Sequence, residues 1–188
     1  GVTIDENPGL DNIRMLQSIE EGKMKAMYLV GEDMALVDSD ANHVDKVLSD
    51  LDFFVVQDIF FSRTAQYADV ILPAAPSLEK EGTFTNTERR VQRLYQALPT
   101  LGDSKPDWWI IQEIANRLGA NWTYDSPSDI FSEMASLAPI FGKANYDVLE
   151  GWNSFLWGSH DGESTPLLYE DGFDFPDKMA RFALSDWV

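Results

Sequence analysis

The sequence contains no cysteine, and its basic residues are scarce. Fourteen Lys and Arg stand against 32 Asp and Glu, which gives a formal net charge of −18. Without cysteine, disulfides, zinc–thiolate sites and cysteine-held iron–sulfur clusters are excluded within this segment. Nucleic-acid binding depends on Lys and Arg that neutralise phosphates, so we expect no nucleic-acid partner. The acidic side chains favour a solvated surface, and a docking face for a basic partner subunit is the alternative.

Long apolar runs are also missing. No stretch approaches the roughly 20 apolar residues that cross a bilayer, so we expect no membrane insertion. No basic segment followed by an apolar one resembles a secretory leader. The chain starts at Gly1 rather than Met, and we expect both of its ends to lie inside a longer protein. The lack of cysteine is compatible with a reducing compartment, and we predict a cytoplasmic location.

What is present supports a folded α/β chain. Hydrophobic residues make up 44% and aromatic residues 12% of the sequence, enough for a core. Apolar runs and one-sided helical patterns alternate over the first 73 residues. We expect helices at 10–21, 41–51 and 62–67, and strands at 26–30, 53–56 and 69–72. The strands look apolar on both faces, as in a buried parallel sheet. This order predicts a three-layer αβα, Rossmann-like, doubly wound and mainly parallel sheet.

The pattern changes after Pro73. Residues 79–87 are polar and predict a long loop, and residues 91–98 predict a strand. We expect a helix from Asp107 with a buried face that includes Ile111 and Leu118, and another after Ser126 with a buried face that includes Leu137. From Gly142 onwards we expect irregular structure. No compositional break divides the chain, so we predict a single partial domain over residues 1–188.

Polar and small residues follow the predicted strands, at the edge of the sheet where ligands of such folds bind. Gly31, Glu32 and Asp33 follow the first strand. The glycine suits close approach of a phosphate, although a plain turn explains it equally well. Gln57 and Asp58 follow the second strand. Asp58 can accept hydrogen bonds from ribose hydroxyls or cap the next turn.

Asp107 offers two readings. It can cap the helix that begins at Trp108, or its two oxygens can pair with the two parallel donors of guanine. The cluster Glu88-Arg89-Arg90 is either a solvated loop or an ordered loop packed on other residues. The sequence has no G-x-x-x-x-G-K-[ST] phosphate loop and no G-x-S-x-G elbow. A phospho-receiver domain is disfavoured, because Ala74 stands where its third-strand Asp would be.

Several stretches resemble the molybdopterin oxidoreductase superfamily, in the form typical of formate dehydrogenase alpha chains. They are VQDIF at 56–60, ADVILP at 68–73, EGTFTNTERRVQR at 81–93, KPDWWII at 105–111 and ALSDW at 183–187. The resemblance implies that the chain is an internal fragment of the catalytic subunit. It would be the C-terminal half of a domain that binds one molybdopterin guanine dinucleotide.

The resemblance also implies what the longer protein does. It would oxidise formate to carbon dioxide with a bis-molybdopterin guanine dinucleotide on Mo or W, and with a 4Fe-4S cluster in its N-terminal part. Formate, the remaining domains of the same chain and an electron-transfer subunit would be its partners. The catalytic and metal-ligating residues would lie upstream, so we expect none here and expect the fragment alone to be inactive. Carried over to this sequence, the cofactor contacts are Gly31, Glu32, Asp33, Gln57, Asp58 and Asp107.

Within these contacts we expect Gln57 and Asp58 on the ribose or phosphate side and Asp107 on guanine. Two other functions stay open. The parent can be a nitrate reductase-like or other oxotransferase of the same superfamily, or a non-catalytic module of a redox complex.

Overall fold

A computed structural model describes residues 7–38 and 40–184. The chain divides into two compact units. One comprises Gly1–Lys80 and Ala97–Trp122, and the other comprises Glu81–Gln96 and Thr123–Val188. That residues 1–188 make up a single partial domain of a larger protein stays a prediction. Of the ALSDW motif, residues 185–187 lie outside the described residues.

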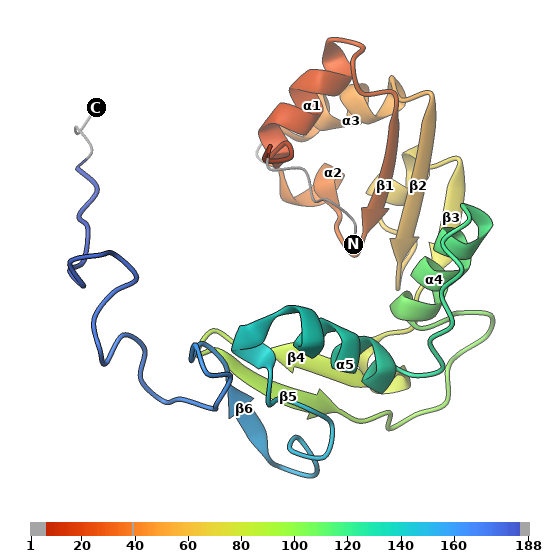
Figure 1. Cartoon of the computed structure of the whole chain (residues 1–188). Coiled ribbons are helices and arrows are strands. Elements are labelled where there is room, and N and C mark those ends of the chain that lie inside the picture. The colour runs from red at the N-terminus through yellow and green to blue at the C-terminus, as the bar shows by residue number, and fades with distance from the viewer. Residues whose placement is uncertain (1–6, 39, 185–188) are drawn as a thin grey trace. The chain divides into compact units, whose positions relative to one another are not determined.

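The first unit contains the predicted parallel sheet. Its strands β1 (Ala26–Val30), β2 (Phe53–Asp58) and β3 (Val70–Pro73) lie side by side in the order β1-β2-β3 (Figure 1). Both strand pairs are parallel, with Val30 opposite Gln57 and Gln57 opposite Leu72. The carboxyl ends of the strands therefore meet at one edge. The predicted α/β class with a parallel sheet is confirmed.

Short polar side chains cap two of the four helices described in this unit, α1 (Asn12–Glu20) and α3 (Ala41–Ser49). The other two helices are α2 (Met34–Val37) and α4 (Asp107–Arg117), and the 3₁₀ turns are η1 (Thr64–Tyr67) and η2 (Ser77–Glu79). The side chain of Asp11 accepts a hydrogen bond from the Arg14 N–H at 2.8 Å, and that of Asp40 from the His43 N–H at 3.2 Å. Each cap satisfies a donor that the first helical turn leaves unpaired.

The core of the first unit lies on one face of the sheet. Leu16, Val44 and Leu48 of the helices pack there against Phe54 and Val56 of β2. The opposite face is more open. Tyr28, Val30 and Phe53 are 41, 43 and 48% exposed. The expectation that the strands are buried on both faces is therefore wrong for β1, because α1, α2 and α3 cover the same face. It is also wrong for β3, in which Val70 and Ile71 are exposed.

The second unit contains an antiparallel sheet that the sequence pattern did not predict. Strands β4 (Gly82–Thr85), β5 (Arg90–Leu94) and β6 (Ser154–Leu156) are ordered β4-β5-β6. The predicted loop at 79–87 thus contains a strand, and the predicted strand at 91–98 ends at Leu94. The β-forming residues Thr83 and Phe84 become a strand because they pair with Arg93 and Gln92 of β5.

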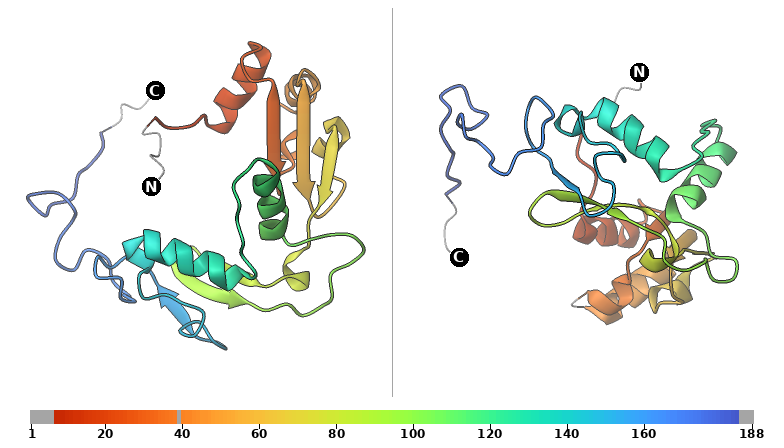
Figure 2. Two further views of the ribbon diagram at one scale, coloured as in Figure 1. Left: turned by 45° about the vertical axis from the view of Figure 1, so that its right-hand side comes forward. Right: turned by 90° about the horizontal axis from the view of Figure 1, so that it is seen from below.

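Helix α5 (Pro127–Leu137) packs across this sheet in contact with β4, and the turn η3 (Pro139–Phe141) follows it (Figure 2). A reciprocal capping box of Ser126 and Asp129 begins the helix. The buried cluster of this unit is made of Val91, Phe131, Ala144, Leu149 and Phe155. No helix in the described part of the chain is both long and apolar enough to span a membrane.

The predicted buried faces of two helices are only partly correct. In α4 the buried residues are Ile110 and Gln112, whereas Leu118, just after the helix, is 84% exposed. In α5 Phe131 is buried, but Leu137, predicted to be buried, is 75% exposed. Apolar spacing identifies a stripe on a helix, but burial also needs a partner surface, and these residues lack one within the described chain.

Candidate functional site at the strand ends

Gly31 brings the ends of β1 and β2 together. Its backbone N–H donates to the Gln57 carbonyl at 2.9 Å. Its φ of +66° is a left-handed conformation that favours glycine, and a Cβ added there would meet no atom within 4 Å. The turn is therefore tight, and the space beside it is open to the close approach of another group.

Glu32 and Asp33 continue this turn, but Glu32 faces solvent whereas Asp33 is hydrogen-bonded within the chain. Glu32 is exposed and borders a hollow of about 410 Å³ that Tyr28 and Met34 also line. The Asp33 carboxylate accepts hydrogen bonds from the Thr64 N–H at 2.9 Å, the Thr64 hydroxyl at 2.7 Å and the Arg63 N–H at 3.2 Å. Burial by itself raises the pKa of Asp33, but these hydrogen bonds from Thr64 and Arg63 outweigh it and lower the pKa. Asp33 thus joins the Gly31 turn to η1, and its contact with a nucleotide stays a prediction.

Gln57 is the central side chain of the site. It is fully buried although it lies at the end of β2. Its Oε1 accepts a hydrogen bond from the Tyr28 hydroxyl, and its Nε2 donates to Asp107 Oδ1 at 2.8 Å. Burial and the nearby negative charge of Asp107 raise the pKa of Tyr28. Both ends of the buried amide are paired, so Gln57 holds Asp107 in one orientation.

Asp107 does not cap its helix. Pro106 is the residue before α4, and no side chain makes a capping hydrogen bond there. Asp107 is the first helical residue, where a carboxylate interacts favourably with the helix dipole. Its Oδ2 forms an ion pair with Lys80 Nζ. The Asp107 side chain is 31% exposed, so part of the carboxylate still faces solvent.

Asp58 lies one residue beyond Gln57 but outside this network. Its Oδ1 accepts from the Ile59 N–H at 2.6 Å, and its carbonyl accepts from the Ala74 N–H at 3.0 Å. These bonds match the local turn-capping alternative, and a ribose contact of Asp58 stays a prediction.

The structure thus places three of the predicted residues, Gly31, Gln57 and Asp107, in one hydrogen-bonded group. Sequence reasoning missed two members of that group, Tyr28 and Lys80. No local sequence motif marks either residue. Tyr28 contacts Gln57 29 residues away, and Lys80 contacts Asp107 27 residues away. Among the described residues, no three His, Cys, Asp or Glu side chains gather in a way that could hold a metal ion.

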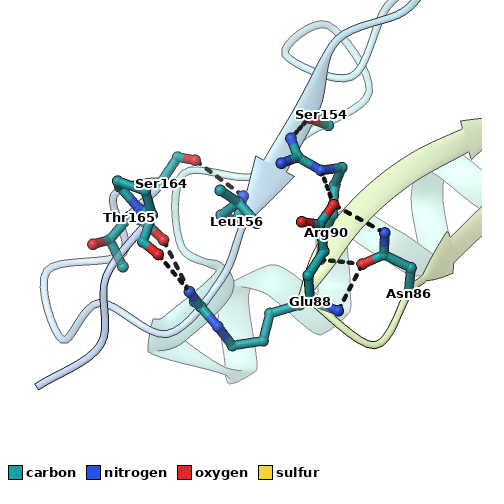
Figure 3. A network of polar contacts seen from close by, with 9 residues as sticks. Asn86, Glu88, Arg90, Ser154, Leu156, Ser164 and Thr165 are labelled. Carbon is teal, nitrogen blue, oxygen red and sulfur yellow. Dashed lines mark hydrogen bonds and ion pairs between the residues drawn. The ribbon is translucent and has the colours of Figure 1, made fainter.

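The stretch at 81–93, here called the signature stretch, is ordered by hydrogen bonds within the second unit, although Asn86 and Glu88 are exposed. The Asn86 side-chain oxygen accepts from the N–H groups of Glu88 and Arg90 at 3.1 and 3.0 Å (Figure 3). Arg90 donates to Glu88 at 2.5 Å and to Ser154 of β6 at 2.7 Å (Figure 3). Hydrogen bonds from Arg90 and then Asn86 lower the pKa of Glu88. The cluster therefore joins the β4–β5 turn to β6.

Arg89 ties the same turn to the chain beyond β6. Its backbone has a left-handed φ of 69°. Its guanidinium donates to the carbonyls of Trp157, Thr165 and Pro166, the last two at 3.3 Å. This arginine thus acts as a structural anchor within the second unit.

Comparison with known proteins identifies the class of this chain. Residues 3–117 match the model of the molybdopterin oxidoreductase family, and the chain belongs to that family. A Bacillus subtilis (strain 168) protein named "Putative formate dehydrogenase YrhE" is 84% identical over all 188 residues. A Staphylococcus aureus (strain USA300) protein with the same "putative formate dehydrogenase" description is 54% identical over 98% of the chain. The chain spans 19% of the length of each of these relatives.

A solved structure shares the fold. The acetylene hydratase from Pelobacter acetylenicus superimposes on 80% of this chain with a TM-score of 0.64 and 17% sequence identity. The match covers 23% of that protein. The predicted resemblance to the superfamily and to formate dehydrogenases is confirmed by the family match and by the names of the relatives.

Proposed function

We propose that this chain holds the guanosine and pyrophosphate part of one molybdopterin guanine dinucleotide within a larger formate dehydrogenase. One observation carries the proposal. The partly exposed Asp107 carboxylate is fixed by the buried Gln57 amide beside the Gly31 turn, at the carboxyl ends of two parallel strands. Ligands of open α/β sheets bind at this edge.

The donor and acceptor chemistry of these residues fits the nucleotide end of the cofactor. Guanine presents two neighbouring N–H donors, and a carboxylate presents two neighbouring acceptors. The turn at Gly31 is open enough for a pyrophosphate to approach the backbone. Since the Gly31 N–H already bonds to Gln57, Gly31 would shape the turn, and the amides after it would face the phosphates. Asp58 and the exposed Glu32 would suit sugar hydroxyls.

The residues of this chain would bind and orient the cofactor, while the bound group supplies the two-electron chemistry that converts formate to carbon dioxide. We propose a bis-molybdopterin guanine dinucleotide with Mo or W, and a 4Fe-4S cluster elsewhere in the protein. The family match supports a molybdopterin cofactor, and the names of the relatives support formate as the substrate. The remaining domains and an electron-transfer subunit would be its partners, in the cytoplasm. The fragment alone would be inactive.

The test uses the full-length protein, purified without oxygen, beside its Asp107→Ala variant. Metal content, guanine released by acid hydrolysis and formate-dependent dye reduction would be measured on each. We expect bound Mo or W and formate oxidation in the unsubstituted protein, and loss of cofactor in the variant. Asp103→Ala, a change of the same type at an exposed position, is the control and should retain the cofactor.

The other outcomes separate the parts of the proposal. A metal-containing protein that ignores formate but reduces an oxyanion would keep the cofactor role and overturn the substrate. A protein without metal and pterin would overturn the cofactor role and favour a non-catalytic module. Full cofactor retention in Asp107→Ala would overturn the guanine assignment alone.

A further inference from the structure

The position of Lys80 beside Asp107 is fixed by the hydrogen bonds of the preceding residue, Glu79. Lys80 follows η2, in which the Glu79 carboxylate accepts from the Leu101 N–H at 2.8 Å and the Glu79 carbonyl from the Thr100 hydroxyl at 3.2 Å. The Lys80 side chain is only 23% exposed, and its Nζ pairs with Asp107 Oδ2. A lysine that is fixed in this way presents its ammonium group at a defined place.

The carboxylate of Asp107 has room for further donors. An ionised carboxylate accepts about four hydrogen bonds, two on each oxygen. Gln57 Nε2 uses one position on Oδ1, and Lys80 uses one position on Oδ2. One acceptor position is then left on each oxygen, which is what two parallel donors of one ligand require.

Lys80 adds a donor next to these two acceptor positions. Its ammonium has three N–H groups, and one of them is directed to Asp107. The Watson–Crick edge of guanine carries the N2 amino group, the N1–H and the O6 acceptor in a row. Two acceptors followed by a donor complement that order. On adenine an acceptor replaces the N1–H and an amino group replaces O6, so the contacts to Asp107 and to Lys80 would both be mismatched.

We infer that Lys80 is a specificity-determining residue, which donates a hydrogen bond to O6 of a purine whose N1–H and N2 amino group bind Asp107. This inference rests on the proposed function and deepens it. Asp107 and Lys80 would together recognise the Watson–Crick edge of guanine, and the buried amide of Gln57 would hold Asp107 in place.

Binding of three mononucleotides to the full-length protein, prepared without pterin, tests this inference. Guanosine, inosine and adenosine monophosphates are titrated by calorimetry. Inosine monophosphate keeps N1–H and O6 but lacks the N2 amino group. We expect the affinities to fall in the order guanosine, inosine, adenosine.

Two variants should affect the ratio of guanosine to inosine affinity differently. Lys80→Met should weaken guanosine and inosine monophosphates by the same factor, about tenfold or more for a lost bond to a charged donor. The ratio between these two affinities should not change. Asp107→Ala should instead weaken guanosine more than inosine monophosphate, because it removes both acceptors, so guanosine loses two hydrogen bonds and inosine loses one. Lys46→Met, the same change on exposed α3, is the control and should bind like the unsubstituted protein.

The alternative results are distinct. If Lys80→Met binds guanosine monophosphate equally well or better, Lys80 only competes for Asp107 and the inference is overturned. If Lys80→Met lowers the ratio of guanosine to inosine affinity, Lys80 merely positions Asp107, and the O6 contact is again overturned. If the unsubstituted protein binds no guanosine monophosphate, or Asp107→Ala does not affect it, the proposed function fails as well. Equal thermal unfolding midpoints would show that the variants are folded.

Discussion

The alanine variant of Asp33 perturbs the turn beside the candidate site. In Asp33→Ala, the Thr64 N–H, the Thr64 hydroxyl and the Arg63 N–H all lose their acceptor. Thr64 is fully buried, so neither of its donors can turn to water. Leaving a buried donor unpaired costs about 1–3 kcal/mol, and Arg63 is exposed and can bond to water. For the two Thr64 donors together we therefore expect the first unit to lose about 2–6 kcal/mol of stability.

Urea unfolding at pH 7 measures this loss. Hydrogen exchange at the backbone amides of β2 and α3 would follow the first unit by itself, so that unfolding of the second unit does not enter the result. Asp33→Asn retains one acceptor oxygen and should lose less. Asp103→Ala, an exposed position, should change stability by less than about 0.5 kcal/mol. A loss below about 1 kcal/mol in Asp33→Ala would refute the reasoning, because buried Thr64 would then not depend on Asp33.

The pH dependence of the same variant has a defined sign. The folded pKa of Asp33 lies below its ordinary value, so the folded state binds a proton less readily than the unfolded state. The stabilisation is complete above the unfolded pKa of about 3.9 and is lost as the pH falls through the folded pKa. The difference in stability between the unsubstituted chain and Asp33→Ala should thus be constant from about pH 5 to 8 and shrink below about pH 4. A difference that grows in acid would contradict the assigned hydrogen bonds.

Two further substitutions test the turn and the signature stretch. Gly31→Ala should lower the free energy of unfolding by about 1–2 kcal/mol through the left-handed φ alone, because the added Cβ meets no atom within 4 Å. A loss above about 4 kcal/mol in urea unfolding would contradict this absence of a clash. Arg89→Ala should speed amide exchange in residues 154–166, since its guanidinium holds the carbonyls of Trp157, Thr165 and Pro166, whereas Arg117→Ala on exposed α4 should not. If amide exchange in residues 154–166 is unchanged in Arg89→Ala, Arg89 does not anchor this segment.

Local signals predicted the elements of the first unit well. The strand β1 has the predicted bounds, and Asp11 and Asp40 begin α1 and α3 as capping residues. Gly22 follows α1 with a φ of +67°, a left-handed conformation that favours glycine and ends the helix. These features depend on neighbours within about four residues, and such short-range chemistry can be read directly from a sequence.

The errors share a physical cause, which is pairing between distant residues. Residues 82–85 look like a polar loop by themselves and become β4 only through hydrogen bonds to β5. Similarly, the apolar stripe that includes Leu118 is visible in the sequence, but its exposure depends on which surfaces lie next to α4. The Lys80–Asp107 pair belongs to the same class, because nothing near position 80 indicates a partner 27 residues away.

Four carboxylates lie at the ends of β1 and β2 or at the start of α4, where an anionic dinucleotide is proposed to bind. They belong to Glu32, Asp33, Asp58 and Asp107. Three of these four carboxylates, those of Asp33, Asp58 and Asp107, accept hydrogen bonds from other groups of the chain. Asp33 is bonded to Arg63 and Thr64, and Asp58 is bonded to the Ile59 N–H.

Asp107 differs from the other two because its ion pair with Lys80 neutralises its charge but leaves an acceptor position on each oxygen. Glu32 is exposed, so solvent screens its charge. The acidic residues are thus compatible with a nucleotide if they meet its hydrogen-bond donors, while the phosphates lie against the backbone after Gly31. Replacing Asp107 should therefore reduce the recognition of guanine, whereas replacing Glu32 should affect mainly the electrostatic attraction of the nucleotide.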